Sequence, residues 1–169
     1  MTHPPPPAPA SRTAASGQAS GQASGVAYVG TFDPERLLKA RLGGHVGALA
    51  IGYRAHGRDW IELDLPYADK LVGDPVSGVM ASGAILALMD MACGMSIWIA
   101  RNAFVPQATL DLRIDYLRPA TPGKTVTGRG ECYRLTHSIA FVRGLAHDGD
   151  PADPLAQVAA TFIFTGPLT

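Results

Sequence analysis

The sequence lacks the features of a disulfide-stabilised or nucleic-acid-binding protein. It contains only 2 cysteines in 169 residues, Cys93 and Cys132. Two cysteines without a secretory signal are typical of reduced thiols. Charge of neither sign is in excess, because 14 Lys and Arg residues balance 14 Asp and Glu residues. A protein that binds nucleic acid through phosphate contacts usually carries a basic excess or stripe. We therefore expect neither a disulfide framework nor a nucleic-acid partner.

The N-terminal segment lacks the side chains that build a core. Residues 1–25 are mostly Pro, Ala, Ser, Gly and Gln, including the near-repeat SGQASGQASG, and they bury too little apolar surface to offset the entropy of ordering. We expect a disordered tail. A proline-rich docking ligand is the less favoured alternative, because PPPP has no basic flank. The stretch MTHPPPPAPASR has no apolar run, so we expect no signal peptide and a cytoplasmic protein.

What the chain does have is apolar material for one core. Residues 26–169 form a single predicted domain, and 47% of the sequence is hydrophobic. Its centre is the run at residues 77–100, SGVMASGAILALMDMACGMSIWIA, in which Asp90 is the only charged residue. A helix this long and apolar suits either a membrane span or a buried core helix. The central carboxylate, the lack of flanking Lys or Arg clusters and the amphipathic strands that follow favour the buried helix.

The chain before the long helix is predicted to hold a short helix and a hairpin. Asp33 and Pro34 are typical of a helix start, and the pair Gly43 and Gly44 is typical of a helix stop, which places this helix at about residues 34–42. The runs at residues 48–55 and 59–65 have the composition and alternation of half-buried strands.

The rest of the chain adds a loop, the long helix and four strands. Residues 67–77 are predicted as a loop and Ser82 as the N-cap of the helix. The predicted strands are 109–118, 124–133, 138–146 and 157–165. In the first, alternation predicts one shared face made of Leu110, Leu112, Ile114 and Tyr116. In the second, Gly128 and Gly130 leave a thin surface for close approach. The order lacks βαβ alternation, so we predict an α+β fold in which an antiparallel sheet curls around the long apolar helix.

Asp90 is the one charged residue in this apolar run, and its presence there needs an explanation. At about 100° per residue its neighbours on the helix surface are apolar: Gly83, Leu86, Ala87, Cys93, Gly94 and Ile97. A carboxylate buried among such residues should have a raised pKa, as a general base often has. We therefore expect a catalytic or ligand-directed role, with a structural role as the alternative. Cys93 is expected to be an inert core thiol, because no histidine lies near it in the sequence.

Two groups of residues along the chain form recognisable motifs. The first group is Asp74, Pro75, Gly78 and Val79, followed by Leu88, Asp90, Ala92, Cys93 and Gly94. The second is Thr109, Leu110 and Asp111 with Tyr116, Leu117, Arg118, Pro119, Ala120 and Gly123. Together they resemble the motifs of a known family, the PaaI-like acyl-CoA thioesterases of the hotdog fold, and the resemblance covers about residues 33–165.

The resemblance implies a hotdog-fold homodimer, paired again into a homotetramer in many members, with active sites at the dimer interface. It implies that Asp90 acts as nucleophile or as general base for water. It also implies that a backbone N–H at the helix start, at Ser82 with Gly83 beside it, polarises the thioester carbonyl. The implied substrate is a small-molecule acyl-CoA thioester. No metal, redox cofactor or membrane partner is implied.

The sequence departs from the family pattern at three polar positions. The family usually has His-Gly-Gly where this chain has Ala81, Ser82 and Gly83, so the histidine is absent. Pro75 stands where many members have Asn or Gln, and Gly94 where a Ser or Thr is common. Ala81 and Gly94 are expected to lie in the substrate site. The groups expected near the CoA phosphates, with surface solubility as the alternative for each, are Arg118, Lys124, Arg134, Arg143 and His137.

Two functions of different class therefore stay open. The first is a cytoplasmic acyl-CoA thioesterase that uses Asp90. The second is a hotdog protein that binds acyl-CoA or another acyl ligand without turnover, because the family's histidine is missing. A dehydratase or hydratase of this fold is weaker, since such enzymes pair a histidine with an acid and no histidine lies between Asp59 and Leu135.

Overall fold

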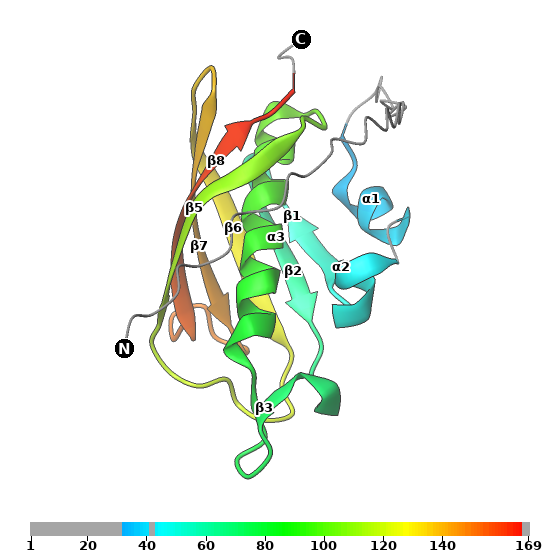
Figure 1. The fold of residues 1–169 in the computed structure, drawn as a ribbon, viewed down its shortest axis with the longest axis vertical. Coiled ribbons are helices and arrows are strands. Elements are labelled where there is room, and N and C mark those ends of the chain that lie inside the picture. The colour runs from blue at the N-terminus through cyan, green and yellow to red at the C-terminus, as the bar shows by residue number, and fades with distance from the viewer. Residues whose placement is uncertain (1–31, 41–42, 167–169) are drawn as a thin grey trace, which may run out of the picture.

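A twisted antiparallel sheet with a long helix across one face forms the main body of the molecule (Figure 1). The computed structural model of the chain describes residues 32–40 and 43–166. The helices are α1 (Pro34–Ala40), α2 (Gly44–Leu49), the 3-10 turn η1 (Asp69–Leu71) and α3 (Ser82–Arg101). The strands are β1 (Gly52–His56), β2 (Trp60–Leu65), β3 (Val72–Asp74), β4 (Val79–Met80), β5 (Gln107–Tyr116), β6 (Val126–Leu135), β7 (Ile139–His147) and β8 (Ala156–Phe164).

Six of these strands form one sheet in the order β1-β2-β6-β7-β8-β5, and every neighbouring pair is antiparallel. β3 and β4 form a separate hairpin that projects at the end of the molecule where α3 begins (Figure 1). The predicted α+β hotdog architecture, a curled antiparallel sheet with a long central apolar helix, is confirmed. The predicted tail at residues 1–25 lies outside the described residues.

The close packing of α3 on β6 depends on glycine. A Cβ added to Gly130 would lie 2.5 Å from the carbonyl oxygen of Ala92, and one added to Gly128 would lie 2.8 Å from Cγ of Leu88. Both distances are shorter than real Cβ contacts, so a side chain at either position would push the helix away from the sheet. The close-approach surface predicted from these glycines is therefore observed. Because α3 lies directly against it, one side of α3 is buried in the core.

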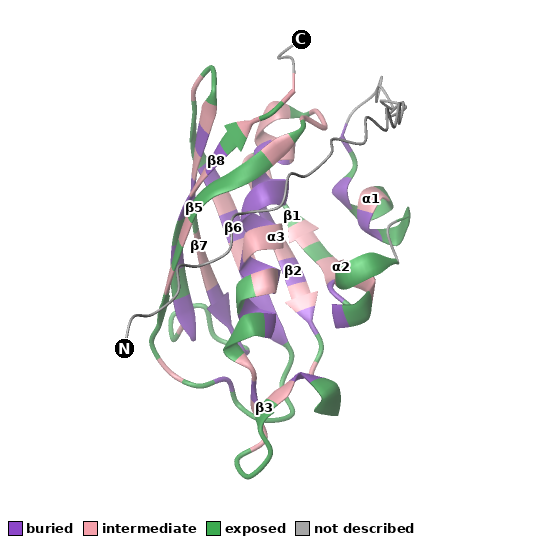
Figure 2. Ribbon diagram, in the orientation of Figure 1, coloured by how far each residue is buried: buried purple, intermediate pink, exposed green. Residues whose placement is uncertain are grey.

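The two sides of α3 differ strongly in burial (Figure 2). Leu88, Met89 and Ala92 are completely buried, whereas Ser82 and Leu86 are exposed. By length and composition alone α3 could cross a membrane, yet 56% of its most apolar window is already buried inside the fold. The core helix of a soluble fold passes the same test, so the burial favours the predicted core role.

The segment before β1 corrects the prediction. Gly43 and Gly44 do not lead directly into a strand at residue 48, because Gly44, with a φ of 66°, begins the short helix α2 and the strand starts only at Gly52. The apolar run fits either structure by its pattern alone. In the helix, Leu49 is buried and Val46 packs against the core, so the helix covers these apolar side chains.

The region before α3 also holds more structure than predicted. The stretch at residues 67–77, predicted as a loop, contains η1 and strand β3 of the hairpin. In its turn the Asp74 carboxylate accepts hydrogen bonds from Ser77 and from the backbone N–H of Val76, which lower the pKa of Asp74. The predicted N-cap is wrong by one residue: Ser82 is the first helical residue, and Ala81 holds the N-cap position without a side-chain hydrogen bond.

The burial predicted for β5 is only partly right. Leu112 and Ile114 are half-buried, but Leu110 is 57% exposed and Tyr116 is 44% exposed. The pairing with β8 shifts register between Thr109 and Asp111, which interrupts the alternation. β5 is also the edge strand of the sheet, so less of it is covered.

Arg118 ties two loops together through carboxylates. Its Nη2 lies 2.8 Å from Oδ1 of Asp148, and its Nε lies 2.9 Å from Oδ2 of Asp153. The backbone N–H of Thr121 donates to Oδ2 of Asp148 at 2.8 Å. The side chain of Asp148 is 4% exposed. The Arg118 guanidinium, helped by Thr121, holds the pKa of this carboxyl well below its usual range.

We predict that Asp148→Asn lowers the free energy of unfolding at pH 7 by about 2–4 kcal/mol, because it leaves Arg118 without its buried partner. A depressed folded-state pKa stabilises the fold above the unfolded pKa of about 3.9, and that stabilisation is lost as the pH falls further. The stabilities of wild type and variant measured by urea unfolding should therefore approach each other progressively as the pH falls from about 5 to about 1. The matched control is Asp115→Asn, which breaks the exposed Arg113–Asp115 pair and should change stability by less than about 0.5 kcal/mol. A difference that does not depend on pH would contradict the assignment.

Candidate active site

The open side of α3 carries Asp90, but its surroundings differ from the prediction. Asp90 is partly exposed rather than buried among small residues. The Thr109 hydroxyl donates a hydrogen bond to its Oδ1 at 2.8 Å. This partner comes from β5, 19 residues further along the chain. The carboxylate therefore keeps a polar partner even though Gly94 occupies the position one turn after it.

Three hydrogen bonds hold β5 beside α3. Gln107 Nε2 donates to the Gly94 carbonyl at 2.7 Å, Thr109 donates to Asp90, and the Tyr116 hydroxyl donates to the Ser82 carbonyl at 2.7 Å. Gln107 and Thr109 are two residues apart and so share one face of the strand. Burial is the main cause of a raised pKa at Tyr116, so its hydroxyl stays protonated and able to donate. The sequence predicts no functional role for the side chains of Thr109 and Tyr116, because their contacts with α3 depend on where β5 lies in the sheet.

The start of α3 offers backbone donors. Ala84 N–H bonds to the Ala81 carbonyl at 3.1 Å, but within residues 32–40 and 43–166 the N–H groups of Ser82 and Gly83 make no hydrogen bond. Free N–H groups and the helix dipole favour negative charge at this end. A Cβ on Gly83 would meet nothing within 4 Å, so the approach to these amides is open.

A mostly apolar pocket of about 270 Å³ adjoins this helix start. It is lined by Val79, Met80, Ser82, Ile85, Tyr116, Leu117, Arg118, Pro119 and Ala120. It joins the hairpin β3–β4, the first turn of α3 and the segment after β5. It has the composition to hold the apolar part of a ligand beside the free amides.

The structure separates the predicted basic residues. Lys124 is exposed and lies between β5 and β6, beside the paired Arg118. Arg134 lies at the far end of β6, and His137 lies in the turn that follows it. The 10 residues of β6 separate these two ends, a span of about 33 Å. Arg118 already pairs with Asp148 and Asp153. Within one chain these side chains therefore do not converge on one phosphate group.

The other predicted positions also have clear places. Ala81 donates its N–H to the Leu71 carbonyl at 2.8 Å, which anchors the helix start to η1. Pro75 is exposed in the hairpin that precedes α3. Gly94 is buried, and a Cβ there would lie 3.3 Å from Nε2 of Gln107. Ala81 therefore packs beside Gly73 of the hairpin, and Gly94 lies underneath Gln107. Neither of these two residues lines the pocket beside the helix start.

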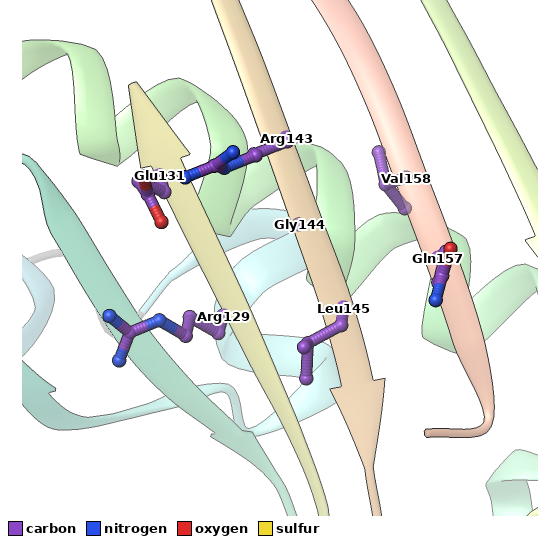
Figure 3. Close-up of a pocket in the computed structure, with 7 residues that line it drawn as sticks. All are labelled: Arg129, Glu131, Arg143, Gly144, Leu145, Gln157 and Val158. Carbon is purple, nitrogen blue, oxygen red and sulfur yellow. Dashed lines mark hydrogen bonds and ion pairs between the residues drawn. The ribbon is translucent and has the colours of Figure 1, made fainter. Parts of the chain in front are cut away.

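A second pocket, of about 240 Å³, lies on the opposite face of the sheet (Figure 3). It is lined by Arg129, Glu131, Arg143, Gly144, Leu145, Gln157 and Val158. Arg143 pairs with Glu131 at 2.6 Å, and Arg129 pairs with Glu62 at 3.0 Å while stacking over Trp60. Both guanidinium charges are compensated within the chain, and the pocket holds no pair of groups suited to acid–base or nucleophilic chemistry.

The cysteines do not provide a nucleophile. Burial raises the pKa of Cys93 to about 12, with a smaller contribution from Asp90, and burial raises the pKa of Cys132 to about 11. Both thiols are free and stay protonated at neutral pH, which makes them unreactive. Among the described residues no group of three His, Cys, Asp or Glu side chains is placed to hold a metal ion.

The fold is that of a hotdog protein with an open carboxylate on its central helix. The sequence matches the model of the thioesterase superfamily over residues 77–154. A Pseudomonas aeruginosa protein of known structure is 42% identical, with a TM-score of 0.68, over 76% of this chain and 94% of that chain. The chain belongs to the thioesterase superfamily.

Two further solved structures have the same fold. A thioesterase from Haemophilus influenzae matches with a TM-score of 0.72 and 23% identity, over 83% of this chain and 95% of that chain. A phenylacetic acid degradation-related protein from Ralstonia eutropha matches with a TM-score of 0.63 and 24% identity, over 76% of this chain and 96% of that chain. No curated protein sequence matches the chain. The family predicted from the sequence is confirmed at the level of the superfamily.

We predict that neither thiol reacts in the folded protein. With a disulfide reagent at pH 8, the native chain should release far less than one equivalent of thiol within an hour, because both pKa values lie well above that pH. The same assay in guanidinium chloride should count 2 thiols and serves as the control. Fast stoichiometric reaction at Cys93 in the native protein would restore it as a candidate nucleophile.

Proposed function

We propose that the chain is an acyl-CoA thioesterase in which Asp90 carries the hydrolysis. The observation that supports this most is the Thr109–Asp90 hydrogen bond on the open face of α3, because it fixes a carboxylate where a ligand can reach it. Asp90 either takes a proton from the attacking water or attacks the thioester carbon itself. Thr109 orients the carboxylate, so the lone pair of Oδ2 stays available.

The carbonyl oxygen of the substrate is proposed to sit on the backbone amides of Ser82 and Gly83. These N–H groups have no partner in the described chain and stand at the positive end of the α3 dipole. As negative charge develops on the oxygen, donors fixed in this way stabilise it without reorganisation. Coenzyme A leaves as the thiol. Water supplies the oxygen of the released carboxylic acid, either by attacking the thioester directly or by hydrolysing an acyl–Asp90 anhydride. The reaction needs no metal or redox cofactor. A non-catalytic acyl ligand binder is the alternative if this turnover is not found.

One chain cannot place both the Asp90 carboxylate and the backbone amide of Ser82 on the same thioester. Ser82 and Asp90 are eight residues apart on α3, which is about 12 Å along the axis. A carboxylate and an amide that act on one thioester lie within roughly 7 Å of each other. We therefore propose a homodimer in which Asp90 of one copy faces the helix start of the other.

The direct test is hydrolysis of a panel of acyl-CoA thioesters by wild type, Asp90→Asn and Thr109→Val. Asp90→Asn should lower kcat by about 10²- to 10⁴-fold, because the base or nucleophile is gone. Thr109→Val should lower kcat less, since the carboxylate remains but is no longer oriented. Background rates for wild type together with a thermal shift on adding acyl-CoA would support the binding protein instead. Unchanged hydrolysis by Asp90→Asn would remove Asp90 from the mechanism.

Mixed dimers test whether the site spans two chains. Ser82→Pro removes one amide where proline fits, because Ser82 is the first helical residue and Ala81 has the extended conformation that proline requires of its predecessor. Alone it should lose about 10²- to 10³-fold in kcat, with Ser82→Ala, which keeps the N–H, as control. When Ser82→Pro and Asp90→Asn chains are unfolded together and refolded, half of the dimers are mixed and each has one intact site, so about a quarter of the wild-type rate should return. No recovery would place the site within one chain.

A further inference from the structure

The hydrogen bond from Tyr116 to Ser82 acts on more than the position of β5. The Tyr116 hydroxyl donates to the Ser82 carbonyl at 2.7 Å. That carbonyl and the N–H of Gly83 are the two ends of one planar peptide group. Whatever fixes the carbonyl end therefore also fixes the direction of the Gly83 N–H, which is one of the two amides proposed to hold the carbonyl oxygen of the substrate.

This peptide group has little support from its own helix. It lies in the first turn of α3, where the N-cap residue Ala81 makes no side-chain hydrogen bond. Ser82 and Gly83 are both exposed, and glycine adds backbone freedom. In a regular α-helix the Ser82 carbonyl accepts one bond, from the N–H of Leu86 four residues further on. A carbonyl oxygen has two lone pairs, so the Tyr116 hydroxyl supplies the second bond that this oxygen can accept.

The same bond makes the Gly83 N–H a stronger donor. A hydrogen bond accepted by the carbonyl of an amide draws electron density toward the oxygen and leaves the N–H of that amide more polarised. Burial raises the pKa of Tyr116, so its hydroxyl keeps its proton at neutral pH and remains a donor. Tyr116 and Ser82 both line the mostly apolar pocket beside the helix start, so this bond lies in the wall of the site itself.

From this geometry we infer that Tyr116 is a positioning residue for the hydrolysis, acting on the bound carbonyl oxygen through the peptide group that joins Ser82 and Gly83. The inference rests on the proposed function, since it uses the Gly83 amide as a donor to the substrate. It adds a residue of β5 to the machinery without any contact between Tyr116 and the thioester. The helix start supplies the donor, and the strand sets the direction and strength of that donor.

The first test separates catalysis from binding. Tyr116→Phe keeps the ring in the wall of the pocket and removes only the hydroxyl. It should lower kcat for the best acyl-CoA substrate by about 5- to 50-fold, less than the loss of a donor itself, while KM stays within about twofold. The matched control is Tyr133→Phe, at an exposed tyrosine of β6, which should leave both constants unchanged. A rise in KM without a fall in kcat, or no change in either, would overturn the inference.

The amide proton of Gly83 gives a readout that a purely structural role of Tyr116 would not move in the same way. In a proton–nitrogen NMR correlation spectrum of the free protein, Tyr116→Phe should shift this proton upfield, because its amide is less polarised. A tyrosine with one ring fluorine at position 116 is a stronger donor of nearly the same shape and should shift it downfield. This second variant also covers the case in which Tyr116→Phe does not fold. A Gly83 signal that responds to neither change, or that moves the same way in both, would show the inference to be wrong.

The two proposals fail separately. If the wild type hydrolyses acyl-CoA thioesters but the Gly83 proton does not respond, the thioesterase stands and Tyr116 is not its positioning residue. Opposite shifts of the Gly83 proton in a protein without turnover would refute the enzyme and leave Tyr116 as the residue that orients this amide toward a bound acyl ligand.

Discussion

The contact between α3 and the bare backbone of β6 governs the rest of the structure. At Gly128 and Gly130 there is no room for a side chain, so the helix lies directly against the strand. That contact fixes which side of an almost uniformly apolar helix becomes core. The opposite side is left as a narrow open strip, and Asp90 lies on it. This contact therefore completes the core on one side of α3. On the other side it leaves Asp90, the only charged residue of the helix before its last, partly exposed.

The sequence predicts this core well because its signals are local. Length and apolarity identify α3, alternation identifies β2, and paired glycines identify the strand that the helix approaches. The hairpin β3–β4 is missed because two very short strands leave no periodicity to detect. α2 is missed because a short apolar run fits a helix or a strand, and only the burial of Leu49 decides between them.

The site is predicted less completely because its partners come from different elements. Asp90 stands out in the sequence as an isolated charge, but its hydrogen bond to Thr109 exists only because the sheet order places β5 at the edge beside α3. The basic residues illustrate the opposite case. Lys124 and Arg134 are both basic and lie only ten positions apart in the sequence. Strand β6 nevertheless places Arg134 at one end of the molecule and leaves Lys124 at the other. A pattern along the chain cannot reveal which strand ends meet.

The topology also has a kinetic consequence. β2 pairs with β6, and the hydrogen bond between Asp64 and Thr127 joins residues 63 positions apart. β6, β7 and β8 pair with their neighbours in sequence, so they close shorter loops and are expected to form earlier. Until β1 and β2 arrive, the flank of α3 that they cover remains in water. We therefore expect the apolar surface of α3 to be most exposed, and aggregation to be most favoured, before β2 pairs with β6.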